Sequence, residues 1–156
     1  IRYNRFIYDR YVEMADKYNV GLAFENMADR DNKRRFCSVA HELAALIDDF
    51  NSPRVGACWD FGHANRVYTN QIEAIKQMGK RLKATHVDDN VGQTDLHLLP
   101  FLGNIPWEKI MKALTEIGYE GDFVYEITLN KSMPEELKLD AAKLAYQVGQ
   151  YLLSLA

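Results

Sequence analysis

The stretch Cys58-Trp59-Asp60-Phe61-Gly62-His63-Ala64-Asn65 decides the fold, because a short apolar run ends in it at a carboxylate. The run from Val55 to Trp59 is followed at once by Asp60, and His63 comes three residues later. This pattern is typical of a buried strand that runs into a polar loop. Aspartate and histidine both bind divalent metals, so the end of this strand is a candidate metal site.

The same layout occurs three more times along the chain. Apolar runs end in a carboxylate or a histidine at Gly21-Leu22-Ala23-Phe24-Glu25, Leu82-Lys83-Ala84-Thr85-His86 and Asp122-Phe123-Val124-Tyr125-Glu126. The runs lack a clean alternation of polar and apolar residues, which favours strands buried on both faces. We therefore expect strands near residues 20–25, 55–60, 82–87 and 122–127, in a single domain that spans residues 1–156.

Helical patterns separate these strands. Apolar residues recur at helical spacing from Ile1 to Tyr18, where we expect the aromatic side chains in the core, and again from Arg34 to Phe50. Shorter patterns follow at Asn70 to Gly79 and Pro106 to Ile117, and a last helix is expected to begin near Ser132. A helix followed by four strand–helix units predicts the α/β class with a parallel sheet.

Four strand–helix units amount to half of a (β/α)8 TIM barrel, which typically has about 250 residues. A four-stranded sheet of this kind leaves two unpaired edges. The chain also begins with Ile1 rather than methionine, so we expect it to be a piece of a longer protein. The expected partner is the missing half of the barrel or a second copy of the chain.

Charge and composition narrow the possible functions. Hydrophobic residues make up 47% of the chain and charged residues 26%, which is typical of a globular domain. The net charge of −3 weighs against a nucleic-acid partner, and no apolar run is long enough to span a membrane. Cys37 and Cys58 form no CxxC pair, so we expect reduced thiols in a cytoplasmic protein.

The four strand ends are expected to converge, because all strands of a parallel barrel point the same way and functional groups gather at their carboxyl ends. The converging side chains are Glu25, Asp60, His86 and Glu126. Three carboxylates held together repel one another unless a cation offsets their charge. A set of oxygen ligands with one imidazole and no thiolate suits Mn²⁺, Mg²⁺, Co²⁺ or Zn²⁺.

Six blocks of sequence together resemble the C-terminal half of the xylose-isomerase-like TIM-barrel superfamily. This superfamily includes sugar isomerases and epimerases and the metal-dependent apurinic endonucleases. The blocks are Ala23-Phe24-Glu25-Asn26-Met27, Trp59-Asp60-Phe61-Gly62-His63-Ala64, Thr85-His86-Val87-Asp88-Asp89-Asn90, Asp95-Leu96-His97-Leu98-Leu99-Pro100, Gly103-Asn104-Ile105-Pro106-Trp107 and Val124-Tyr125-Glu126. They follow the order and spacing of the family through nearly the whole chain.

The resemblance implies a role for each matching residue. The metal ligands are expected to be Glu25, Asp60, His86 and Glu126, with Mn²⁺ as the first choice of ion. The resemblance to the sugar branch makes Glu25 and Glu126 the acid/base pair, which moves a proton of a sugar or polyol through an enediolate. The expected substrate-binding residues are His63, Asp95 and His97.

Two alternatives stay open beside the sugar isomerase or epimerase. In the endonuclease branch, the residues that match His63, Asp95 and His97 are zinc ligands, so a zinc-dependent phosphodiesterase is the second hypothesis. The third is a catalytically inactive half-barrel that only assembles, with a partner half or with itself. It rests on the four strand–helix units that a complete barrel needs and this chain lacks.

Two departures from the family pattern qualify the resemblance. The family usually has Pro-Gly-x-Gly where this chain has Pro100-Phe101-Leu102-Gly103, which puts the contacts of that loop with substrate in question. Residues 87–94 contain no arginine, which weakens the case for a ketohexose 3-epimerase in particular. The run Asp88-Asp89-Asn90 is expected to be a solvated polar segment, whereas Trp59 and Trp107 are expected in the core.

Overall fold

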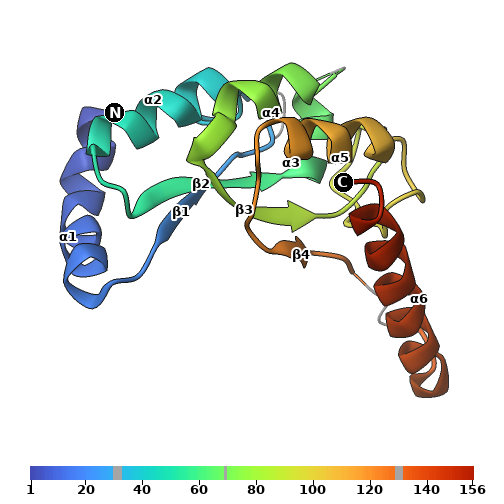
Figure 1. Cartoon of the computed structure of the whole chain (residues 1–156). Coiled ribbons are helices and arrows are strands. Elements are labelled where there is room, and N and C mark those ends of the chain that lie inside the picture. Colours follow the sequence, from blue (N-terminus) through green and yellow to red (C-terminus); the bar gives the residue numbers. More distant parts are fainter. Residues whose placement is uncertain (30–32, 69, 129–131) are drawn as a thin grey trace.

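A four-stranded parallel sheet lies at the centre of the molecule (Figure 1). Its strands are β1 (Leu22–Glu25), β2 (Val55–Asp60), β3 (Leu82–Val87) and β4 (Phe123–Tyr125), in the order β1-β2-β3-β4. Each strand pairs in parallel with its neighbour in sequence, as expected for repeated strand–helix units. The predicted α/β class and all four predicted strands are therefore confirmed.

The register of the sheet brings the strand ends level with one another. Glu25 of β1 lies opposite Cys58, Asp60 of β2 lies opposite His86, and His86 in turn lies opposite Val124. The strand β2 is buried along its whole length, as its apolar sequence predicts. The carboxyl ends of the strands consequently form one edge, and this edge carries the residues singled out by the sequence.

The computed structural model describes residues 1–29, 33–68, 70–128 and 132–156. Its helices are α1 (Arg2–Tyr18), α2 (Ala40–Phe50), α3 (Phe61–Val67), α4 (Ile72–Met78), the 3-10 turn η1 (Gly79–Arg81), α5 (Trp107–Glu116) and α6 (Glu135–Leu153). Figure 1 shows α2, α3, α4 and α5 on one side of the sheet, with α1 beyond β1 and α6 beyond β4. Among the described residues, no helix is long and apolar enough to cross a membrane.

One predicted helix is shorter than expected, and one helix was not predicted. The second helix begins at Ala40 rather than Arg34. The segment after Asp60 is not a loop but the short helix α3, and Asp60 is its N-cap residue. The Asp60 Oδ1 accepts a hydrogen bond from the backbone N–H of His63 at 2.6 Å, which satisfies one of the free donors of the first helical turn. The prediction of a polar loop after Asp60 was therefore wrong.

The core lies between the sheet and the helix layer and is rich in aromatic residues. Trp59 and Trp107 are both buried there, as predicted. The indole N–H of Trp59 donates to the Gln71 side chain at 2.9 Å, and the ring centroids of Phe61 and Trp107 are 5.3 Å apart. Because Trp59 points toward the helices, the alternation along β2 turns Asp60 to the opposite face.

Most aromatic side chains of α1 are exposed, which contradicts the expectation that they belong to the core. Tyr8 is the exception, because its ring packs against Phe24 with the centroids 5.0 Å apart. Only Val12 and Ala15 of this helix are buried, whereas Tyr3 is 73% exposed and Phe6 is 85% exposed. Helical spacing identified an apolar side correctly, but spacing alone cannot tell whether a neighbour covers that side. Within the part of the chain that the structure describes, nothing covers it.

Candidate metal centre

The four predicted ligands meet at the carboxyl edge of the sheet. Glu25 and Asp60 end β1 and β2, His86 lies one residue before the end of β3, and Glu126 directly follows β4. One ligand atom from each of these four side chains lies within 4.8 Å of the other three. The structure therefore brings together all four residues, and their role as ligands stays a prediction.

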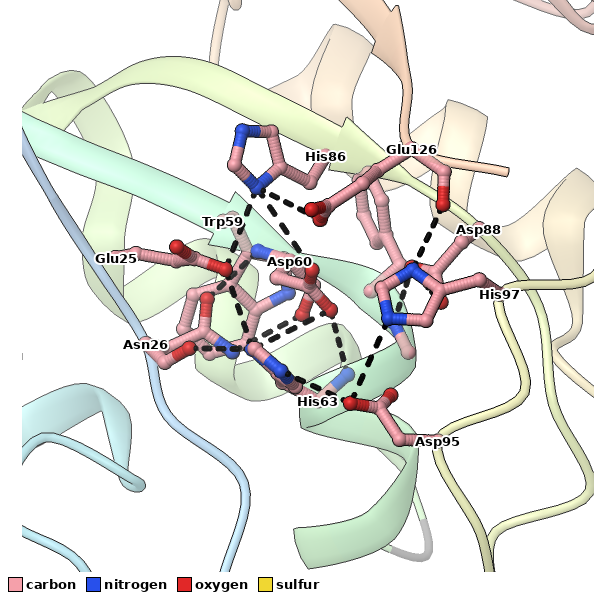
Figure 2. A network of polar contacts seen from close by, with 12 residues as sticks. Glu25, Asn26, Trp59, Asp60, His63, His86, Asp88, Asp95, His97 and Glu126 are labelled. Carbon is pink, nitrogen blue, oxygen red and sulfur yellow. Dashed lines mark hydrogen bonds and ion pairs between the residues drawn. The ribbon is translucent and has the colours of Figure 1, made fainter. Parts of the chain in front are cut away.

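His86 lies among the three carboxylates (Figure 2). Its Nδ1 is 3.1 Å from Glu126 Oε2, 3.3 Å from Glu25 Oε1 and 3.8 Å from Asp60 Oδ2. The donor atoms at this point are thus three carboxylate oxygens and one imidazole nitrogen. This combination fits a hard or borderline divalent cation such as Mn²⁺.

The environment of Asp60 shows whether a cation would be favourable among these four side chains. Its side chain is fully buried, and its Oδ2 has no hydrogen-bond partner among the described residues. Burial, together with the negative charge of Asp88, raises the pKa of Asp60 to about 8. Burying a carboxylate oxygen without a hydrogen bond costs free energy, and a cation bound to that oxygen would remove this cost. The donor set therefore fits a divalent ion.

His63 bridges the four-residue cluster and the neighbouring loop. Its Nδ1 lies 2.9 Å from the Asn26 carbonyl oxygen and 3.3 Å from Glu25 Oε1, while its Nε2 lies 3.2 Å from Asp95 Oδ2. Burial opposes the charged form of this imidazole, but the bond to Glu25 and the charges of Asp60 and Asp95 outweigh it and raise its pKa to about 9. The same hydrogen bond from His63 lowers the pKa of Glu25 below its usual value, against the effect of burial.

A second group of possible ligands lies beside the first and consists of Asp88, Asp95 and His97. The His97 Nδ1 lies 2.8 Å from the Glu126 carbonyl oxygen, so this nitrogen carries the proton and Nε2 faces Asp95 Oδ2 at 3.7 Å. His63 and His97 thus both direct Nε2 at one carboxylate (Figure 2). The structure places all three predicted substrate-binding residues next to the four-residue cluster.

The run Asp88-Asp89-Asn90 is fully buried, so the prediction of a solvated polar segment was wrong. Asp89 accepts hydrogen bonds from the backbone N–H groups of Phe101 at 3.0 Å and Ile105 at 3.2 Å, and from the Trp107 indole at 2.9 Å. Asn90 donates to the Gly62 carbonyl at 2.9 Å. These side chains attach the loop before α5 to the start of α3, next to the candidate metal centre.

Comparison with known proteins places this geometry in a family. Residues 8–146 match the family described as xylose isomerase-like TIM barrel. The chain belongs to this family. That result confirms the resemblance inferred from the sequence, and it agrees with a parallel strand–helix architecture whose functional groups lie at the carboxyl ends of the strands.

Curated relatives of this xylose isomerase-like chain include proteins of several organisms. An uncharacterized protein of Methanocaldococcus jannaschii is 32% identical over 130 residues, which cover 81% of this chain and 42% of that protein. The D-psicose 3-epimerase of Enterocloster bolteae is 32% identical over 89 residues, which cover 57% of this chain and 28% of the epimerase. The chain therefore spans less than half the length of these curated relatives.

Similar solved structures are also about twice as long as the region that matches this chain. A D-tagatose 3-epimerase-like protein superposes with a TM-score of 0.70 and 26% identity, over 92% of this chain and 52% of that protein. A D-psicose 3-epimerase crystallised in the presence of D-fructose gives a TM-score of 0.78 at 18% identity, over 94% and 54% of the two chains. The described sheet thus corresponds in fold to half of a xylose isomerase-like barrel.

Asn26 and Asp88 are the residues near the cluster to which sequence reasoning assigned no site role. Asn26 directly follows Glu25, so its position next to a predicted ligand was a usable signal. Asp88 lies two residues after His86, and strand periodicity places such residues on the same face. The sequence predicts Asp88 in a solvated run, because charged residues are usually exposed, and it indicates no separate role for Asn26.

Proposed function

We propose that this chain is the C-terminal, metal-binding half of a divalent-metal-dependent sugar or polyol isomerase or epimerase. The observation that carries the proposal is the convergence of Glu25, Asp60, His86 and Glu126, whose ligand atoms lie within 4.8 Å of one another. The names of its relatives support the substrate class, because they include a D-psicose 3-epimerase and a fructoselysine 3-epimerase. These relatives favour a ketose-type sugar, although residues 87–94 lack the arginine expected for a ketohexose 3-epimerase.

The proposed ion is Mn²⁺, with Mg²⁺, Co²⁺ or Zn²⁺ as the other members of the same ligand class. Glu25, Asp60, His86 and Glu126 hold it. When bound, a divalent cation supplies Lewis-acid stabilisation of negative charge that develops on a substrate oxygen. The remaining chemistry belongs to the side chains around it.

Proton transfer is assigned to Glu25 and Glu126. They come from β1 and β4, the two outer strands, so they approach the cluster from opposite sides of Asp60 and His86. Glu25 is ionised at neutral pH, since its pKa lies below the usual carboxylate value, so it is in the form that can accept a proton. The side chain of Glu126 is 47% exposed, so it can exchange a proton with a substrate bound at the carboxyl edge of the sheet. His63, Asp95 and His97 are the proposed substrate contacts.

The experiment that tests this proposal has a binding part and a chemical part. The metal-free chain is titrated with Mn²⁺ by calorimetry, and one ion per chain is expected, with much weaker binding after Asp60→Asn. In the full-length protein, Glu126→Gln is expected to abolish incorporation of solvent deuterium next to the ketose carbonyl while the fold is kept. Absence of Mn²⁺ binding by the unmodified chain, or undiminished exchange in the Glu126→Gln protein, contradicts the proposal.

A zinc-dependent phosphodiesterase of the endonuclease type is the second candidate. One observation favours it: Asp88, Asp95 and His97 form a second ligand group, and His63 Nε2 lies 3.2 Å from Asp95 Oδ2. The net charge of −3 opposes it, because nucleic-acid surfaces are usually basic. Metal analysis separates the two candidates, since more than one tightly held zinc ion per chain favours the phosphodiesterase.

The proposed partner is the other half of the barrel. Among the described residues β1 pairs only with β2 and β4 only with β3, so both outer edges of the sheet are unpaired. A groove of about 470 Å³ lies between β4 and α6, and its lining includes Phe123, Tyr125 and Ala145. This groove and the exposed aromatic side of α1 lie next to the two free edges, where additional strand–helix units would pack.

A half of different sequence fits these edges better than a second copy of this chain. A second copy would bring another set of Glu25, Asp60 and Glu126 to the carboxyl edge of the completed sheet. Repulsion between the six carboxylates would oppose assembly unless a cation neutralised each set. We therefore favour the missing half over homodimerisation or an inactive assembly. A cytoplasmic location is part of the proposal, since Cys37 and Cys58 are both free and buried thiols.

A further inference from the structure

Asn26 joins the ends of the two strands that carry Glu25 and Asp60. It directly follows Glu25, and its side chain is fully buried. Its Oδ1 accepts a hydrogen bond from the Asp60 N–H at 2.7 Å, and its Nδ2 donates to the Asp60 carbonyl at 3.0 Å. One side-chain amide is therefore bonded to both backbone polar groups of a proposed metal ligand (Figure 2).

The backbone of Asn26 bonds to the same region. Its N–H donates to the Cys58 carbonyl at 3.3 Å, which extends the pairing of β1 with β2 by one step beyond Glu25. Its carbonyl oxygen lies 2.9 Å from His63 Nδ1 and accepts a hydrogen bond from it. All the polar groups of Asn26 thus bond to β2 or to the first turn of α3.

We propose that Asn26 is a positioning residue for the metal centre, which fixes the backbone of Asp60 relative to Glu25 at the separation that a divalent cation needs. The inference rests on the proposed function, because a positioning role has meaning only if these residues bind an ion. Groups that orient metal ligands typically contribute a 10- to 100-fold factor to metal affinity when they are removed. The Asn26 side chain bonds to the backbone of Asp60, so the effect of removing this side chain acts through Asp60.

Gln71 offers a matched control, because it makes similar bonds to the neighbours of Asp60. This buried amide accepts from the Trp59 indole at 2.9 Å and donates to the Phe61 carbonyl at 3.2 Å. It therefore supports the residues on both sides of Asp60 but, within the described part of the chain, makes no hydrogen bond to Asp60 itself. Loss of Gln71 reports the general cost of removing a buried amide near the end of β2.

The test compares Asn26→Ala and Gln71→Ala in the full chain, with Mn²⁺ and Co²⁺ as probes. Melting temperatures give the structural cost of each change, calorimetry gives the Mn²⁺ affinity, and the visible absorption of bound Co²⁺ reports its coordination geometry. We expect Asn26→Ala to weaken Mn²⁺ binding 10- to 100-fold and to alter the Co²⁺ spectrum. Gln71→Ala is expected to lower the melting temperature and leave both metal readouts within about threefold of the unmodified chain.

Each other outcome overturns a defined part of the proposal. Equal metal affinities and spectra for the two variants contradict the positioning role while leaving the metal centre intact. Failure of the unmodified chain to bind either ion contradicts the proposed function and the inference with it. If Asn26→Ala does not fold, Asn26→Ser replaces it, because a serine hydroxyl is too short to pair with both backbone groups of Asp60. Unchanged Mn²⁺ affinity in that variant again contradicts the positioning role.

Discussion

The carboxylate of Asp88 lies directly against the backbone of Gly62. A Cβ atom placed on Gly62 would be 2.2 Å from Asp88 Oδ2, and the Gly62 N–H already donates to Asp88 Oδ1 at 3.1 Å. Because Asp88 is fully buried, it has no solvent space into which it can move. The glycine is therefore needed for the close approach of α3 to the end of β3.

Replacement of Gly62 by alanine is expected to destabilise the chain by about 1–3 kcal/mol, because the added methyl group overfills a packed site. Urea unfolding measures the change. Gly21→Ala is the control, since the nearest atom to its added Cβ is the Arg54 carbonyl oxygen at 3.8 Å, and the expected change there is within about 0.5 kcal/mol. Equal stabilities for the two variants would show that the contact between Gly62 and Asp88 is not tight.

Asp89 organises the loop that precedes α5. Replacement of Asp89 by alanine leaves the N–H groups of Phe101, Ile105 and Trp107 without their acceptor, and a loss of roughly 3–5 kcal/mol is expected. Chemical denaturation measures it, with loss of the near-ultraviolet signal of the tryptophans as a local readout. Asp140→Ala is the control, because this exposed carboxylate pairs with exposed Lys143 and should contribute under 1 kcal/mol. A comparable loss from both variants would contradict the buried role of Asp89.

The stability of the metal-free chain is expected to fall as the pH rises from 6.5 to 8. Burial raises the pKa of Asp60 to about 8, and the surrounding carboxylates raise that of His63 to about 9, from ordinary values of 3.8 and 6.5. In this interval the folded chain binds more protons at this pair than the unfolded chain, in which Asp60 is ionised and His63 is losing its proton. Stability is therefore lost with rising pH, on the order of 1–2 kcal/mol per pH unit. Melting temperatures in a chelator measure the trend.

A matched variant and added metal serve as controls for this pH dependence. Asp60→Asn removes one of the two groups, so its melting temperature should depend less steeply on pH. Added Mn²⁺ should stabilise the unmodified chain more at pH 8 than at pH 6.5, because the ion competes with the same protons. A metal-free melting temperature that increases over this interval would show that the two groups are not protonated as described.

The exposed side of α1 should tolerate polar substitution. Phe6 is 85% exposed, so Phe6→Ser is expected to change the free energy of unfolding of the isolated chain by less than about 0.5 kcal/mol. Val12→Ser on the buried side of the same helix should cost about 1–3 kcal/mol. Thermal unfolding of both variants distinguishes the two sides. A large loss for Phe6→Ser would mean that α1 packs through its aromatic side.

The fold and the position of the cluster were predictable because each strand ends in the same way. A short apolar run followed by a ligand type recurs at Glu25, Asp60, His86 and Glu126, and parallel strand–helix units bring such ends together. The outer contacts of the site were not predictable by the same reasoning. Asp88 and Asp89 look like surface residues in a sequence, and only the three-dimensional arrangement supplies the donors that make their burial possible.

The helix α3 was also not predictable from local sequence. The polar residues after Asp60 are compatible with a turn as well as with a helix, and a seven-residue helix has too little apolar periodicity to reveal itself. Its formation depends on the Asp60 cap and on the packing of Phe61 against Trp107, which is far away in the sequence. The prediction that the aromatic residues of α1 lie in the core failed for the opposite reason. Their helical spacing was clear, but most of them are not covered by any described residue.

All four residues of the proposed metal cluster lie between Glu25 and Glu126, in one continuous part of a single polypeptide. A gene segment that encodes this part therefore carries the whole proposed ligand set, together with the proposed substrate contacts His63, Asp95 and His97. Recombination outside residues 25–126 leaves the cluster intact, so under the proposed function these side chains are inherited as one unit.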